Sequence, residues 1–118
     1  MAGRDQLEEG ESGVISDQRA EQAFEFLRDS TERIGAARGA YERAEIMRKR
    51  VRKRAFVGAE GSSVAQREAL AEINEDVQQA DDQYIEAVVA FETLRAKRDI
   101  ETIALDVWRT ESANRRRS

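Results

Sequence analysis

The feature that most constrains the fold is that none of the 118 residues is proline. Because proline breaks the interior of a helix, a chain without it can form helices that are much longer than average. Charged residues make up 37% of the chain and aromatic residues 6%. This composition is typical of long helices and coiled coils, and the length fits a single domain. We therefore expect an all-α protein.

Two heptad patterns predict two long helices joined by a glycine-containing turn. We expect a mobile N-terminal tail at 1–15 and a helical domain at 16–118, with helices at 17–57 and 63–113 and the turn at 58–62. The heptad positions of the first helix are Ala20, Ala23, Leu27, Ser30, Ile34, Ala37, Tyr41, Ala44, Arg48, Val51 and Ala55. Those of the second helix are Leu70, Ile73, Val77, Ala80, Tyr84, Ala87, Phe91, Leu94, Arg98, Glu101, Leu105 and Trp108.

The two heptads predict a long antiparallel hairpin, coiled-coil-like, in which large side chains face small ones. Ser16 or Asp17 is expected to cap the first helix, and a capping box at Ser63-Val64-Ala65-Gln66 is expected to start the second. We call the line along which the heptad positions of the two helices meet the seam. The short turn sets which residues face each other across it. The expected neighbours across the seam include Val51–Leu70, Arg48–Ile73, Tyr41–Ala80 and Ser30–Phe91. At the open end, Arg19 is expected to pair with Glu101.

A basic segment, Arg48–Arg54, precedes the turn: six of its seven residues are Arg or Lys, in a chain with a net charge of −4. One interpretation is a solvated face balanced by Glu68, Glu72, Glu75 and Asp76 across the turn. The other is a patch that binds the phosphates of nucleic acid without reading sequence. On a helix Arg48 points to the seam, where Glu72 or Glu75 can reach it. The candidate phosphate contacts are Lys49, Arg50, Lys53, Arg54 and Arg43, with Phe56 as the ring available to stack on a base.

Residue types needed for most catalysis are missing. The chain has no histidine and no cysteine, so neither side chain can serve as a nucleophile or as a base near neutral pH. The glycine-containing turn lacks the lysine of a phosphate-binding loop. We expect a protein that is not an enzyme and that needs no cofactor or metal. No apolar run approaches the ~20 residues of a membrane span, so we expect a cytoplasmic protein that does not enter a membrane.

Apolar residues are left over near the C-terminal end after the seam is filled. The dense group consists of Ile100, Ile103, Leu105, Val107 and Trp108. A second apolar stripe on a two-helix unit is typical of self-association. We therefore expect a homo-oligomer that assembles through this group.

The order of these parts resembles the UvsY-type recombination mediators of tailed phages. The resemblance covers roughly residues 20–110 and is carried by Tyr41-Glu42-Arg43-Ala44-Glu45, then the basic segment, then Phe56-Val57-Gly58. In that family the basic segment contacts single-stranded DNA and the C-terminal helix assembles a ring. Members load a RecA-like recombinase onto DNA coated by single-strand-binding protein. The resemblance implies that Lys49, Arg50, Lys53 and Arg54 contact DNA, that Ile100–Trp108 forms the assembly surface, and that the protein works in the cytoplasm of a phage-infected cell.

The alternative is a structural or adaptor coiled coil, such as a phage assembly factor or a secretion-type chaperone. In that case the basic segment binds an acidic protein partner instead of DNA. Aromatic residues interleaved with the cations would favour DNA, and Phe56 is the one ring beside the basic segment.

Overall fold

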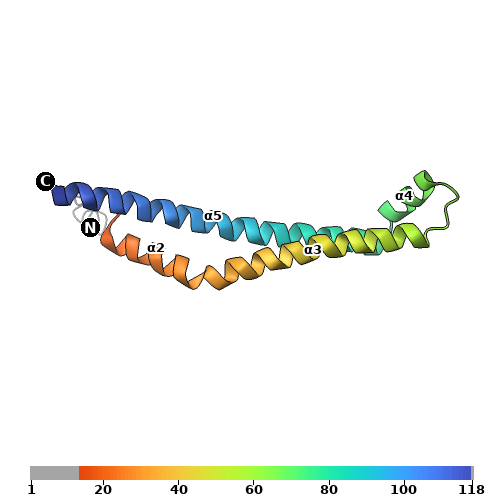
Figure 1. The fold of residues 1–118 in the computed structure, drawn as a ribbon, viewed down its shortest axis with the longest axis horizontal. Helices are drawn as coiled ribbons and strands as arrows, with labels where there is room; N and C mark the ends of the chain where they lie inside the picture. Colours follow the sequence, from red (N-terminus) through yellow and green to blue (C-terminus); the bar gives the residue numbers. More distant parts are fainter. Residues whose placement is uncertain (1–13, 118) are drawn as a thin grey trace, which may run out of the picture. The chain divides into compact units, whose positions relative to one another are not determined.

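The computed structural model describes residues 14–117, so most of the tail expected at 1–15 lies outside the described residues. This part of the chain is all-α. Its helices are α2 (Asp17–Asp29), α3 (Thr31–Gly58), α4 (Val64–Glu72) and α5 (Glu75–Arg117). They form a helical hairpin in which α2 and α3 each run antiparallel to the stretch of α5 beside them (Figure 1). The predicted all-α helical hairpin is confirmed.

The hairpin consists of two compact units, where the sequence predicts one domain. One unit combines the chain up to Arg33 with the chain from Leu94 onward, and the other is Ile34–Thr93. We call them the terminal unit and the central unit. Helices α3 and α5 each contribute to both.

The terminal unit is built on small residues that let α2 approach α5 closely. Its buried cluster is Ala20, Ala23, Ala104 and Leu105, with Ile15, Leu27 and Trp108 packed against it. Ser16 caps α2, since its Oγ accepts a hydrogen bond from the Arg19 amide at 3.0 Å. Arg19 Nη2 lies 2.6 Å from Glu101 Oε2. The expected cap and the expected Arg19–Glu101 pair are both present.

A break at Ser30 divides the first predicted helix into α2 and α3. The fully buried Ser30 hydroxyl donates to the Phe26 carbonyl at 2.6 Å. Arg98 Nη1 donates to Ser30 Oγ at 2.6 Å and to the Leu27 carbonyl at 2.7 Å. Hydroxyls that bond back to the preceding turn bend helices, and groups that take backbone carbonyls interrupt the helical ladder. The continuous helix predicted at 17–57 is therefore wrong at this point.

We expect Arg98→Met to lower the free energy of unfolding by about 1.5–3 kcal/mol, since it keeps the aliphatic stem but removes a charged donor from two acceptors. Urea denaturation followed by circular dichroism measures this change. The control is Lys97→Met on the exposed side of the same helix, which should stay within about 0.5 kcal/mol of wild type. Equal effects of the two substitutions would contradict the role of Arg98.

The central unit packs α3 against the first part of α5. Its buried side chains include Val77, Ala80 and Phe91, all at heptad positions predicted to face the seam. The rings of Tyr41 and Phe91 lie 5.1 Å apart between centroids. The Arg48 guanidinium lies 4.3 Å from the centroid of the Tyr84 ring.

These contacts correct the predicted register. Tyr41 faces Phe91 instead of Ala80, and Arg48 faces Tyr84 instead of Ile73. Tyr41 and Arg48 of α3 thus lie opposite residues of α5 that come later in the sequence than predicted. The reason is that the connection is longer than the predicted turn, because α4 lies between the turn and the start of α5. Leu70 and Ile73, predicted in the seam, are 42% and 68% exposed.

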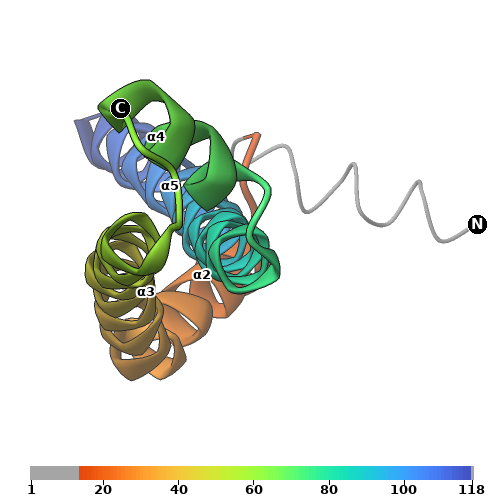
Figure 2. The same cartoon turned by 90° about the vertical axis from the view of Figure 1, so that its right-hand side faces the viewer.

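Local hydrogen bonds explain why α4 is a separate helix. Ser63 Oγ accepts from the Gln66 amide at 3.2 Å, as predicted, but the Gln66 side chain accepts from Ser62 instead of Ser63. Asn74 Oδ1 accepts from the amides of Asp76 and Val77 at 2.9 and 3.2 Å and so caps α5. The second predicted helix, 63–113, is therefore interrupted at Ile73 and Asn74. Figure 2 shows α4 lying to one side of α3 and the adjoining part of α5.

Candidate nucleic-acid interface

The basic segment lies in the C-terminal half of α3, within the central unit. Two of its arginines form ion pairs with α5. Arg48 Nη1 lies 3.9 Å from Asp81 Oδ1, and Arg52 Nη2 lies 3.1 Å from Asp81 Oδ2. The expectation that Arg48 is structural is supported, but its partner is Asp81 and not Glu72 or Glu75. Asp81 thus ties α3 to α5 through two cations.

The four candidate contacts of the basic segment, Lys49, Arg50, Lys53 and Arg54, are all exposed. Lys49 pairs with Glu45 of its own helix at 3.3 Å, and an exposed pair of this kind is worth only about 0.3–0.5 kcal/mol. Arg50, Lys53 and Arg54 form no hydrogen bond or ion pair with residues 14–117. We call these four residues the cationic site. Its charges are available to an anionic partner at little cost.

Arg43, the fifth predicted contact, is exposed further back along α3. Its guanidinium folds toward Gly39, where a β-carbon would lie 3.2 Å from Nη1. It forms no ion pair within the described part of the chain. Arg43 can therefore extend the cationic site toward the middle of the helix.

Apolar side chains lie beside the cations. A shallow surface depression is lined by Met47, Arg50, Lys53, Arg54, Val57 and Gly58. Met47 and Val57 are both exposed within it. Sites that bind single strands combine a row of cations with surfaces on which bases rest. The depression supplies the cations, but its apolar groups are aliphatic and provide no ring on which a base can stack.

A second pocket lies between α3 and α4. It has a volume of about 470 Å³ and is lined by Lys49, Arg52, Lys53, Phe56, Glu68, Ala71 and Glu72. We call it the α3–α4 pocket. Phe56 is partly buried, and the Arg67 guanidinium of α4 lies 6.0 Å from its ring centroid. The predicted stacking residue is thus partly covered by α4, where the heptad pattern predicts one continuous second helix. Asn74, a strong N-cap residue at the start of α5, was the signal that could have indicated the break after α4.

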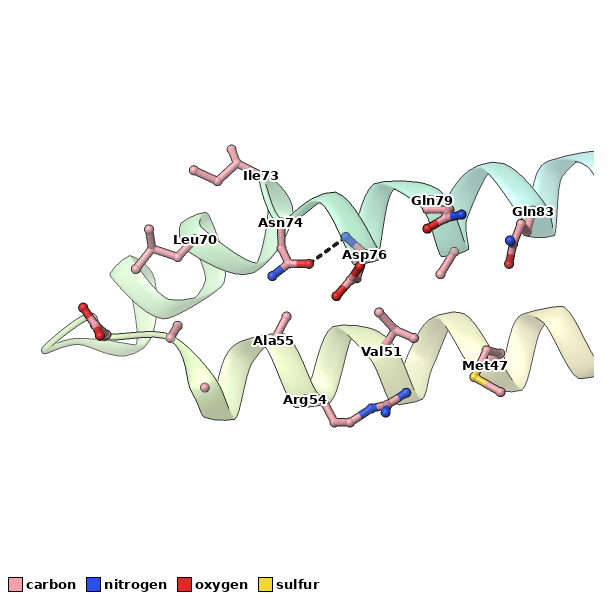
Figure 3. Close-up of a pocket in the computed structure, with 14 residues that line it drawn as sticks. Met47, Val51, Arg54, Ala55, Leu70, Ile73, Asn74, Asp76, Gln79 and Gln83 are labelled. Atoms are coloured by element: carbon pink, nitrogen blue, oxygen red, sulfur yellow. Dashed lines mark hydrogen bonds between the residues drawn. The ribbon is translucent and has the colours of Figure 1, made fainter.

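A further cavity, of about 750 Å³, lies between α3 and the α4–α5 connection (Figure 3). Val51 and Ala55 point into it from α3, whereas Arg54 lies on the opposite side of that helix. Gln79 and Gln83 extend toward it from α5, and Asn74 bonds the Asp76 amide at its end. Its mixture of aliphatic and amide groups brings no pair of acid and base into contact. Of the cationic site, Arg54 lies at the edge of this cavity, and Lys49, Arg50 and Lys53 do not line it.

The predicted assembly residues divide into two groups within the terminal unit. Ile100 and Ile103 are 59% and 61% exposed, and Val107 is also exposed on the same face of α5. We call these three the exposed stripe. Leu105 is 8% exposed and belongs to the buried cluster of the unit. Trp108 packs on that cluster, and its Nε1 donates to Asp17 Oδ1 at 2.8 Å.

Leu105 and Trp108, predicted to be part of the assembly surface, instead pack inside the terminal unit. Both side chains are occupied in holding α5 against α2 in their own chain. The reason is geometric, since the heptad places Leu105 and Trp108 on the seam side of the helix. The exposed stripe lies on another side.

In residues 14–117 no group of three or more acidic, histidine or cysteine side chains is placed to hold a metal ion. No helix in this range is both long enough and apolar enough to cross a membrane. Comparison with protein-family models, curated proteins and solved structures found no match to this chain.

Proposed function

We propose that this protein is a non-enzymatic, oligomeric accessory of DNA recombination that binds single-stranded DNA through its phosphates. The observation that supports the proposal most is the cationic site on α3. Three of its four charges have no partner among the described residues, in a chain whose net charge is −4. Neighbouring cations repel one another, so an arrangement of this kind gains from a polyanion.

The geometry favours contact with phosphates over readout of bases. The cations sit on two sides of one helix, with Lys49 and Lys53 one turn apart, as are Arg50 and Arg54. Helix α3 has 28 residues and lacks the short turn that positions a recognition helix in the major groove. Contacts of this kind position a strand without specifying its sequence.

The resemblance to UvsY-type mediators supplies the more specific part of the proposal. In that role the protein holds single-stranded DNA while a RecA-like recombinase replaces single-strand-binding protein. The exposed stripe supports the homo-oligomer that this role needs, because several cationic sites on one strand raise the effective affinity.

The adaptor function remains the second candidate, supported by the exposed Met47 and Val57 beside the cations. Apolar side chains rimmed by charge also suit a protein partner. The salt dependence of binding to an oligonucleotide distinguishes the two candidates.

We expect the full-length protein to bind a labelled single-stranded oligonucleotide, with an affinity that falls steeply with salt. The logarithm of the association constant should fall by about 0.7 for each tenfold rise in salt per phosphate contacted, or roughly 3 for four contacts. Fluorescence anisotropy at several salt concentrations and with two unrelated oligonucleotide sequences measures this. Absence of binding at low salt would contradict the DNA-binding function and favour the adaptor function with an acidic protein partner.

A further inference from the structure

The α3–α4 pocket places acidic and basic side chains on opposite walls. Lys49, Lys53 and Phe56 share one side of α3, and Glu68 and Glu72 are one turn apart on α4. All five line the pocket. Two carboxylates therefore lie across a solvent-accessible pocket from two of the four residues of the cationic site.

The carboxylates face the lysines without pairing with them. Within residues 14–117 neither Glu68 nor Glu72 forms an ion pair. Lys49 is paired with Glu45, and Arg52 with Asp81. The two glutamates thus lower the positive electrostatic potential at the cationic site without forming ion pairs with its lysines. A phosphate bound at the lysines is therefore repelled by these two carboxylates.

Helix α4 is held weakly. It has nine residues, of which Ala71 alone is buried, and its capping bonds come from Ser62 and Ser63 in the adjoining loop. The Arg67 side chain bonds the Gly61 carbonyl at 3.1 Å. The break at Ile73 and Asn74 separates α4 from α5. A short helix with little buried surface opens at a low free-energy cost compared with the core.

From these observations we propose that α4 is an acidic gate over the cationic site, which a phosphate backbone displaces when it binds. This inference rests on the proposed DNA-binding function and adds its regulation. In the closed state Glu68 and Glu72 compete with phosphates for Lys49 and Lys53. Displacement of α4 removes that competition and uncovers the Phe56 ring, which then becomes available for stacking on a base.

The test removes the two charges while keeping the side-chain size. We expect Glu68→Gln with Glu72→Gln to bind a single-stranded oligonucleotide about five- to tenfold more tightly than wild type, measured by anisotropy at fixed salt. The matched control is Asp82→Asn with Glu86→Gln. It changes the net charge equally on exposed α5 positions that do not line the pocket, and it should change affinity less than twofold. Equal gains in the two variants would overturn the gate.

Hydrogen exchange tests the displacement itself. We expect amides of residues 64–72 to exchange faster than those of 77–91 in the free protein, and faster still after the oligonucleotide is added. Protection of α4 equal to that of α5, or an increase in its protection on binding, would overturn the gate.

The outcomes separate the gate from the function on which it rests. If wild type binds and the glutamine variant binds no tighter than its control, the gate is wrong and the DNA-binding function stands. If only the glutamine variant binds measurably, the gate is supported. If no form of the protein binds single-stranded DNA, both are overturned.

Discussion

Replacing the whole cationic site with alanine, at Lys49, Arg50, Lys53 and Arg54, is expected to weaken single-stranded DNA binding on the order of 100-fold at low salt. Each lost phosphate contact removes a counterion-release contribution, so the logarithmic salt slope should also flatten by about 0.7 per contact. Alanine is the best helix former, and these four residues are exposed. The helix should therefore survive, and circular dichroism can confirm it. If several subunits act on one strand, the measured loss will exceed that of one site.

The control for this variant removes four exposed cations from the terminal unit by replacing Arg28, Arg33, Lys97 and Arg109 with alanine. It changes the net charge by the same amount and should weaken binding less than about fivefold, because only the long-range potential is reduced. Equal losses in the two variants would mean that net charge, and not the site on α3, holds the strand. A cationic-site variant that binds as well as wild type would favour the adaptor function.

The second large effect is expected on assembly. Replacing the exposed stripe, Ile100, Ile103 and Val107, with glutamine should reduce the mass measured by light scattering toward that of one chain, 13.4 kDa. The stripe is solvent-exposed in the single chain, so its apolar surface is available to a second copy. Glutamine leaves the net charge of the chain unchanged and has a good helix propensity. Truncation after Arg98 is a poorer test, because it would also remove Leu105 from the buried cluster.

The matched control replaces Ile85 and Val89, two exposed apolar residues of the central unit, with glutamine. Its mass should equal that of wild type. A wild-type protein that is already monomeric, or a stripe variant that keeps the full oligomer, would contradict the assembly surface. A monomeric stripe variant should also bind single-stranded DNA more weakly, since it loses avidity.

At the break between α4 and α5, a local capping signal and the heptad periodicity favour different structures. Asn74 is a strong N-cap residue, and its side chain bonds the amides of Asp76 and Val77. The heptad pattern continues through it with Leu70, Ile73 and Val77, so the periodicity favours one long helix. The structure keeps Val77 in the core and leaves Ile73 exposed. The Asn74 cap outweighs the heptad periodicity here because the chain must still change direction between α4 and α5.

The cationic site was only partly predictable for a related reason. The run of cations is visible in the sequence, but the partners are set by the register. Asp81 pairs with Arg48 and Arg52, whereas the shorter turn predicts Glu72 or Glu75 as the partner of Arg48. The same register places Glu68 and Glu72 across the α3–α4 pocket. Which charges stay available thus depends on which stretch of α5 lies beside α3.

Local physical chemistry in the sequence determined the helical class, the caps at Ser16 and Ser63, and the inward positions of Ala23, Val77 and Phe91, because caps and heptads act over a few residues. The tertiary structure alone decided the register and the interruption at Ser30. A heptad repeat is nearly unchanged when one helix slides by seven residues along the other, so several registers pair apolar faces almost equally well. The length of the connection and long-range bonds such as that of Arg98 to Ser30 select one of them.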